Sequence, residues 1–300
     1  MQIQAVTALN LSRVETMVFA GGGNRCWWQA GALTHWLSLG WQLPNTLVGT
    51  SAGAAIATAA VANDGLRRAF DSCQQLFGGN IRIFQWRNAA PAEGRFAHQR
   101  IYPVWLASFL NEETFDTVRQ APQQLQIALT RPARALGLRG SIVAGTLSYF
   151  VDKWLWGRLH PQLPRMLGLR QDFVTLQQCT TLEEAQTLLA AAAAAPPLMR
   201  ARQINGDVAI DGGYLDSVPV PEQTLAERRH TLVLLTRHYP KLPPLFLHRD
   251  RYYLQASQRI PVSTWDCRPR ADIHAALALG KHDAARFLAD GLLTLKPVEP

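Results

Sequence analysis

The sequence contains little lysine, and its positive charge comes almost entirely from arginine. Lysine supplies 4 of the 30 basic residues, and the formal net charge is +8. Arginine forks match phosphate and carboxylate groups well, and a basic face would favour anionic lipid surfaces. An arginine-rich codon usage would produce the same composition, so both explanations stay open. The arginines form no dense run and accompany no nucleic-acid motif, so we expect no nucleic-acid partner.

Cysteine is also scarce, and the four cysteines form neither a CxxC pair nor a dense framework. This pattern is typical of free thiols in a reducing compartment or of small buried apolar residues. Three histidines, His35, His98 and His160, lack partners at the spacing of metal ligands. We therefore expect no metal site and no cofactor. The cysteines are Cys26, Cys73, Cys179 and Cys267.

Long hydrophobic runs are lacking. The longest apolar stretch, 47–62, is interrupted by Thr50, Ser51 and Thr58 and is too short to predict a membrane span. Residues 1–14 lack a basic start followed by an unbroken apolar run, so no signal peptide is predicted. We expect a cytoplasmic protein that could associate peripherally with membranes, although export without a signal peptide would leave the same pattern.

The length and the 48% hydrophobic content are typical of a globular chain with a sizeable core. No repeat or long polar linker divides the chain, so we expect a single domain over 1–300. Its motif-bearing core spans about 15–220, and a strand and helices at about 225–292 pack on it. The segment 131–169 is the least regular and could form a cap or lid.

Apolar patterns in the first sixty residues alternate between strand and helix. They predict a strand at 15–20, a helix at 28–39, a strand at 47–48 and a helix that ends near 62. This alternation indicates an α/β fold with a parallel sheet. Further strands are expected at 125–129, 208–210 and 231–235, and further helices at 66–77, from 111, at 181–195 and at 271–288.

Gly49-Thr50-Ser51-Ala52-Gly53 lies between a predicted strand and a predicted helix. This GxSxG pattern is that of a nucleophile elbow, in which small flanking residues let strand and helix approach and expose the serine. The N–H groups of the following helix stabilise developing negative charge. The simpler interpretation is a glycine-rich turn with an idle serine, and the context favours the nucleophile.

Gly21-Gly22-Gly23-Asn24-Arg25 occupies a second strand-to-helix turn. Its exposed N–H groups could form an oxyanion hole or a dinucleotide loop. The GxGxxG pattern fails at Cys26, and no GK[ST] follows, which excludes a P-loop. The oxyanion hole is favoured because both loops end strands of one parallel sheet, and such ends share a crevice.

A serine nucleophile needs a base, and Asp211-Gly212-Gly213 follows a predicted strand. A carboxylate at a strand end could serve, although Asp-Gly is also an ordinary turn. In this order the three blocks resemble the motifs of patatin-like phospholipases, and Pro219-Val220 resembles the segment after the third motif. The resemblance covers about 15–220. It implies a three-layer sandwich with a mostly parallel central sheet.

The resemblance also implies a site and an activity. Ser51 would be the nucleophile, Asp211 the general base, and the N–H groups of Gly22 and Gly23 the oxyanion hole. The activity would be hydrolysis of lipid carboxylic esters, of the phospholipase A or lysophospholipase type, through an acyl-enzyme. The family usually has glycine where this chain has Cys26. The oxyanion hole needs mainly the N–H groups of Gly22 and Gly23, so we expect activity to survive, although the change could narrow the acyl pocket or alter the loop.

Two alternatives stay open. An α/β-hydrolase triad would take its histidine from His238, His274 or His282. A catalytically degenerate scaffold would keep the fold and bind a lipid or protein. A lipid substrate also requires an apolar surface, and a stretch near 142–155 could be an interfacial helix or a core helix. Its apolar residues are Ile142, Val143, Leu147, Phe150, Val151, Trp154 and Leu155, with Lys153, Trp156 and Arg158 nearby.

Overall fold

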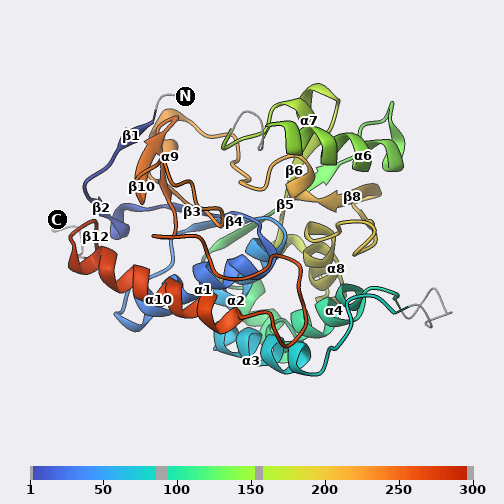
Figure 1. The fold of residues 1–300 in the computed structure, drawn as a ribbon, viewed down its shortest axis with the longest axis horizontal. Coiled ribbons are helices and arrows are strands. Elements are labelled where there is room, and N and C mark those ends of the chain that lie inside the picture. The colour runs from blue at the N-terminus through green and yellow to red at the C-terminus, as the bar shows by residue number, and fades with distance from the viewer. Residues whose placement is uncertain (1–2, 86–93, 153–157, 296–300) are drawn as a thin grey trace.

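The computed structural model describes residues 3–85, 94–152 and 158–295, which form an α/β fold around one large sheet (Figure 1). The sheet contains ten strands of the described chain. In chain order these are β1 (Gln4–Ala5), β3 (Thr16–Phe19), β4 (Thr46–Gly49), β5 (Gln124–Arg131), β6 (Arg170–Thr175), β7 (Arg202–Ile204), β8 (Asp207–Asp211), β9 (Thr231–Leu234), β10 (Leu245–His248) and β11 (Arg251–Leu254).

The centre of the sheet is parallel, in the order β11-β9-β3-β4-β5. The predicted parallel sheet is therefore confirmed. Its outer strands are antiparallel: β10 and β1 extend one edge, and β8, β7 and β6 lie beyond β5. The sequence did not predict the β10–β11 pair or β6. Two further short strands, β2 (Leu9–Asn10) and β12 (Leu293–Thr294), pair apart from this sheet.

Side-chain alternation along the central strands builds two apolar layers. Met17 and Phe19 of β3 belong to the larger core cluster, whereas Val18 belongs to a smaller cluster on the opposite face. Both faces of the sheet are buried, which explains why the sequences of these strands are unbroken apolar runs. The strand β9 repeats the pattern, with Leu232 and Leu234 on one face and Val233 on the other.

Helices cover the first face in a thick layer (Figure 1). This layer comprises α1 (Trp27–Ser38), α2 (Ala52–Val61), α3 (Gly65–Gly78), α4 (Ala97–Phe109), α5 (Glu112–Arg119), α8 (Leu182–Ala192) and α10 (Ile273–Ala289). The opposite side of the described chain carries fewer helices, namely α6 (Gly137–Phe150), α7 (Leu163–Met166) and α9 (Leu225–Arg229), so the three layers are unequal.

Most helix starts agree with the prediction because their caps are local. Asn111 and Thr181 each form a capping box, and α5 and α8 begin directly after them. The prediction that the alanine-rich helix runs to residue 195 is wrong, since α8 ends at Ala192. The helix α4 was not predicted. Pro103 lies inside it, and proline ordinarily argues against a helix interior.

The segment predicted as a cap contains α6 and α7, which lie side by side above the sheet in Figure 1. Part of the predicted interfacial stretch, residues 153–157, lies outside the described residues. Within the described ranges, no helix is both long and apolar enough to cross a membrane.

Candidate active site

Three parallel strands end side by side at one edge of the sheet. The strand β3 lies between β9 and β4, so their carboxyl ends are adjacent. The glycine loop follows β3, Ser51 follows β4, and Thr236 follows β9. Ligands of open α/β sheets bind outside such ends, and the predicted loops indeed meet there.

Ser51 occupies a sharp turn between β4 and α2. Its φ of 54° lies in a region that residues other than glycine rarely adopt, and such strain is typical of functional turns. Gly49 and Gly53 permit the turn. An added Cβ on Gly49 would lie 2.6 Å from the Cα of Ala54, and one on Gly53 would lie 2.6 Å from the carbonyl oxygen of Phe19. The predicted elbow geometry is therefore present.

Asp211 ends β8, and its carboxylate accepts two hydrogen bonds. One comes from the side chain of Ser51, and the other comes from the N–H of Gly213 at 2.7 Å. The side chain is buried, and this burial raises its pKa from 3.8 to about 6, although both hydrogen bonds oppose the change. The structure thus brings Ser51 and Asp211 together although 159 residues separate them.

The backbone holds these two residues through one shared support, the chain end of α8. The N–H of Ser51 donates to the carbonyl of Ala192 at 3.0 Å, and the N–H of Asp211 donates to the carbonyl of Ala194 at 2.8 Å. Gly212 lies against Thr50, and its carbonyl accepts from the Thr130 hydroxyl at 3.0 Å. The serine and the aspartate are therefore fixed to the same short segment.

The glycine loop lies directly beside Ser51. Gly21 donates its N–H to the carbonyl of Ser217 at 2.8 Å, and its own carbonyl accepts from the Thr236 hydroxyl at 2.6 Å. Gly22 lines one cleft together with Ser51, and Gly23 lines a pocket that also includes Ser51. Within the described ranges, the N–H groups of Gly22 and Gly23 have no acceptor. They are available to an oxyanion.

The rest of the predicted loop has structural contacts. The Asn24 amide donates to the carbonyls of Ser263 and Asp266 at 2.9 and 2.7 Å, which ties the glycine loop to the segment 263–266. Arg25 Nε donates to the carbonyl of Gly22 at 3.4 Å. Burial lowers the pKa of Arg25 below its ordinary value, and nearby Arg237 acts in the same direction. Sequence reasoning missed the 263–266 segment and Thr236.

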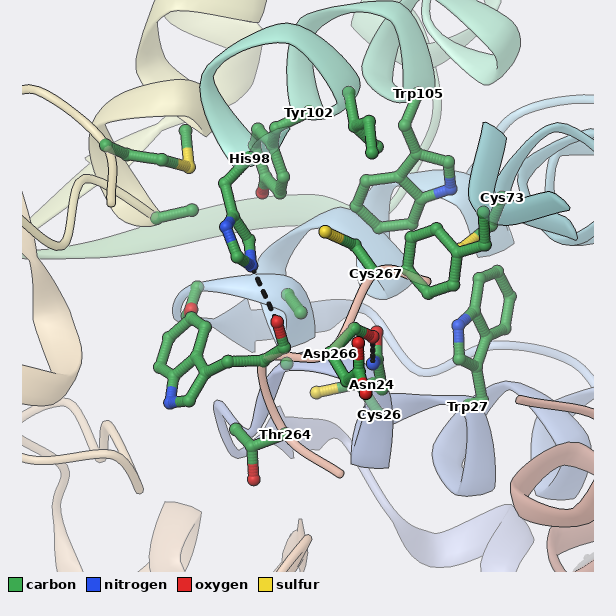
Figure 2. A pocket seen from close by; sticks show the side chains of 18 of the residues that line it. Asn24, Cys26, Trp27, Cys73, His98, Tyr102, Trp105, Thr264, Asp266 and Cys267 are labelled. Atoms are coloured by element: carbon green, nitrogen blue, oxygen red, sulfur yellow. Dashed lines mark hydrogen bonds between the residues drawn. The ribbon is translucent and has the colours of Figure 1, made fainter. Parts of the chain in front are cut away.

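A mostly apolar pocket opens on one side of Ser51 (Figure 2). Its walls come from the loop after β3, from α2, α3 and α4, and from the segment 264–267. The aromatic rings of Trp27 and Trp105 pack edge to face there, with centroids 6.0 Å apart. Cys26 is buried in this wall, where burial raises the pKa of its thiol to about 12, so the thiol is neutral. Two buried polar atoms of the pocket, Tyr102 Oη and His98 Nδ1, have no hydrogen-bond partner within the described chain.

The three histidines considered for a triad lie elsewhere. His238 Nδ1 is hydrogen-bonded with the carbonyl of Ala256 at 3.0 Å, the ring of His274 packs on Phe70, and His282 is exposed. None of them lines the cleft that contains Ser51 and Asp211. Over residues 3–85, 94–152 and 158–295, no cluster of three or more histidine, cysteine or acidic residues is placed to hold a metal ion.

A strained serine that contacts a buried carboxylate at the edge of a parallel sheet is typical of α/β serine hydrolases. A family model described as Patatin-like phospholipase matches residues 17–222, and the chain belongs to this family. The predicted resemblance is thereby confirmed, and membership makes the chain a lipid-ester hydrolase in the general sense. A search of curated proteins found no match.

Proposed function

We propose that this protein hydrolyses carboxylic esters of phospholipids or lysophospholipids through a Ser51–Asp211 dyad. The observation that carries the proposal is the hydrogen bond from strained Ser51 to buried Asp211, beside two N–H groups that lack an acceptor. A nucleophile, its base and an oxyanion site are the three parts that acyl transfer requires.

The reaction begins with the ester carbonyl beside Ser51. Asp211 removes the proton as Ser51 Oγ attacks the carbonyl carbon, and the N–H groups of Gly22 and Gly23 stabilise the oxyanion. Asp211 then gives the proton to the departing alcohol, which leaves an acyl-enzyme. A water molecule, deprotonated by Asp211, attacks the acyl-enzyme, and Asp211 returns the proton to Ser51 Oγ as the fatty acid is released. The pKa of about 6 keeps Asp211 ionised at neutral pH and makes it a better base than an ordinary aspartate.

The apolar pocket supports an acyl-chain substrate. Ser51 and Ala52 lie at its start, and Ile56, Phe77 and Trp105 are among its walls. Each methylene group of an acyl chain that is buried in this pocket contributes about 0.8 kcal/mol to the free energy of binding. The apolar pocket therefore favours a lipid over a small soluble ester. The second cleft, which contains Asp211 and Arg25, leaves room for the alcohol portion of the ester.

The helix α6 supports contact with a lipid surface. Val143, Leu147 and Phe150 are 59, 62 and 59% exposed, and their spacing places them on one side of the helix. Phe150 also lines the cleft with Ser51. Large apolar side chains rarely gather on an exposed surface without a partner. We therefore favour the interfacial interpretation of this helix, with the cleft facing the lipid.

Labelling with a fluorophosphonate probe tests the dyad. The wild-type protein should react, and Ser51→Ala should not. Asp211→Asn should hydrolyse lipid esters at least about 10²-fold more slowly, the scale expected for loss of a general base. Single changes at His238, His274 and His282 should leave turnover intact. Loss of turnover with one of these histidines would instead support the triad, and a folded wild type that resists labelling would support a degenerate scaffold.

A further inference from the structure

A basic cleft adjoins the site on the side of Arg25. Arg25, Thr264 and Trp265 line both this cleft and the one that contains Ser51 and Asp211. The two clefts therefore adjoin at Arg25 and at the segment 264–265. The basic cleft is further lined by residues that follow β9 and β11, namely Thr236, Arg237, His238, Pro240, Arg259, Ile260, Pro261, Val262 and Ser263.

Sheet topology explains why the cations gather there. The strands β3 and β9 are parallel neighbours, so Arg25, after β3, and Arg237, after β9, emerge at the same edge. Thr236 anchors this junction through its hydrogen bond to Gly21. The guanidinium of Arg237 lies 5.4 Å from the ring centre of Tyr239, which restrains its position. Arg259 is exposed at the rim.

Among the residues that the structure describes, the cleft is lined by three arginines and by no acidic residue. Some arginines of the described chain have carboxylate partners, such as Arg131 with Asp172 at 2.6 Å and Arg268 with Asp266 at 2.7 Å. No carboxylate of the described residues pairs with Arg25, Arg237 or Arg259, and these three are distinguished by lining one cleft together. Buried or half-buried charges are ordinarily paired, so neighbouring cations without a counter-charge indicate an anionic ligand.

We propose that Arg25, Arg237 and Arg259 bind the phosphate of the substrate's head group. Arginine forks match phosphate oxygens in a bidentate arrangement. Because the basic cleft adjoins the cleft of Ser51 and Asp211, a phosphate bound there would lie on one side of Ser51 while the acyl chain enters the apolar pocket on the other. The inference rests on the proposed hydrolase function. It assigns the preference for phosphate-bearing esters over the matching neutral esters to these three arginines.

The test compares two substrates that differ only by the phosphate: 1-octanoyl-lysophosphatidate and 1-octanoylglycerol, both below their critical micelle concentrations. The wild type should prefer the phosphate ester, measured as the ratio of kcat/KM values. Arg237→Gln should reduce that preference about tenfold, mainly through KM, because it removes a charge-assisted hydrogen bond. Arg259→Gln, at the exposed rim, should reduce it about threefold, since solvent screens exposed charges.

The control is Arg229→Gln, an equal loss of charge at an exposed position of α9 that does not line the cleft. It should leave the preference unchanged. A preference that survives in both cleft variants would overturn the proposal. An equal loss of activity on both esters in Arg237→Gln would also overturn it, because that result indicates a structural role.

Inorganic phosphate separates a head-group site from a site for a free anion. It should inhibit hydrolysis of the phosphate ester by the wild type competitively and act more weakly on Arg237→Gln. If phosphate inhibits through Arg237 but the wild type shows no preference between the two esters, the cleft serves a free anion and the head-group proposal is wrong. Hydrolysis of octanoylglycerol by the wild type, and its loss in Ser51→Ala, reports on the dyad independently of these arginines.

Discussion

Replacing Asp211 with asparagine should make the protein more stable at neutral pH while it slows turnover at least about 10²-fold. The asparagine has nearly the same shape and keeps an oxygen that can accept from Gly213. It carries no charge, whereas the native carboxylate must be ionised in a buried position to act as a base. The gain should therefore come from removing the cost of burying that charge.

The magnitude follows from the pKa of Asp211. Burial raises it from 3.8 to about 6, and each unit corresponds to about 1.4 kcal/mol, so ionising this group in the native state costs about 3 kcal/mol. Between pH 3.8 and about 6 the native state holds more protons at this group than the unfolded state, so stability falls as pH rises through this window. Above about pH 6, the full cost of about 3 kcal/mol for ionising buried Asp211 lowers the stability of the native state.

Urea denaturation of wild type and Asp211→Asn at pH 4, 5, 7 and 8 checks this reasoning. The two proteins should be similar near pH 4, and the variant should be more stable by about 3 kcal/mol above pH 6. Asp216→Asn is the matched control. Asp216 is equally buried but accepts from His160 at 2.6 Å and from the N–H of Val218 at 2.9 Å, so its loss should destabilise. An Asp211→Asn protein that is less stable than wild type at pH 8 would refute the argument.

Three further outcomes are expected. The kcat/KM for a neutral soluble ester should fall tenfold per pH unit below about pH 6, because protonated Asp211 cannot act as a base. A pH profile that is flat down to pH 4 would exclude Asp211 as the general base. Gly53→Ala should lower the free energy of unfolding by about 1–3 kcal/mol, because the added Cβ would lie 2.6 Å from the carbonyl oxygen of Phe19 in β3. The control is Gly78→Ala, whose Cβ would point into open space, so its melting temperature should be unchanged or slightly higher. Leu147→Glu should weaken binding to phosphatidylglycerol vesicles about tenfold, measured by sedimentation. Leu225 is 51% exposed on α9, and Leu225→Glu should leave this binding unchanged. Equal effects of the two substitutions would argue against α6 as the membrane contact.

The parts of the site that could be predicted are those whose cause is local. The Ser51 turn depends on small residues within two positions of the serine, so the pattern in the sequence is nearly the structure itself. The capping boxes at Asn111 and Thr181 are equally local. The pattern around Asp211 alone predicts only a turn, and the order of all three motifs is needed to predict a general base. The reason is that the contact between Asp211 and Ser51 depends on the pairing of β5 with β8, which no local pattern encodes.

The parts that could not be predicted depend on contacts between distant segments. Thr236 contacts Gly21 only because β9 pairs with β3, although 215 positions separate the two residues. The segment 263–266 carries no motif, and it reaches the site through the Asn24 amide. The helix α4 was missed because tertiary packing of Trp105, Leu106 and Phe109 overrides the proline within it.

The alanine run at the end of α8 has a consequence for how this chain can vary. Each alanine there looks interchangeable, yet the carbonyls of Ala192 and Ala194 hold the backbones of Ser51 and Asp211. One inserted or deleted residue within the helix would turn the carbonyls by about 100° around its axis, since a turn takes 3.6 residues. Such a change in length would therefore separate the serine from the aspartate without altering either one. The length of this run thus matters to the site even where its composition carries no chemistry.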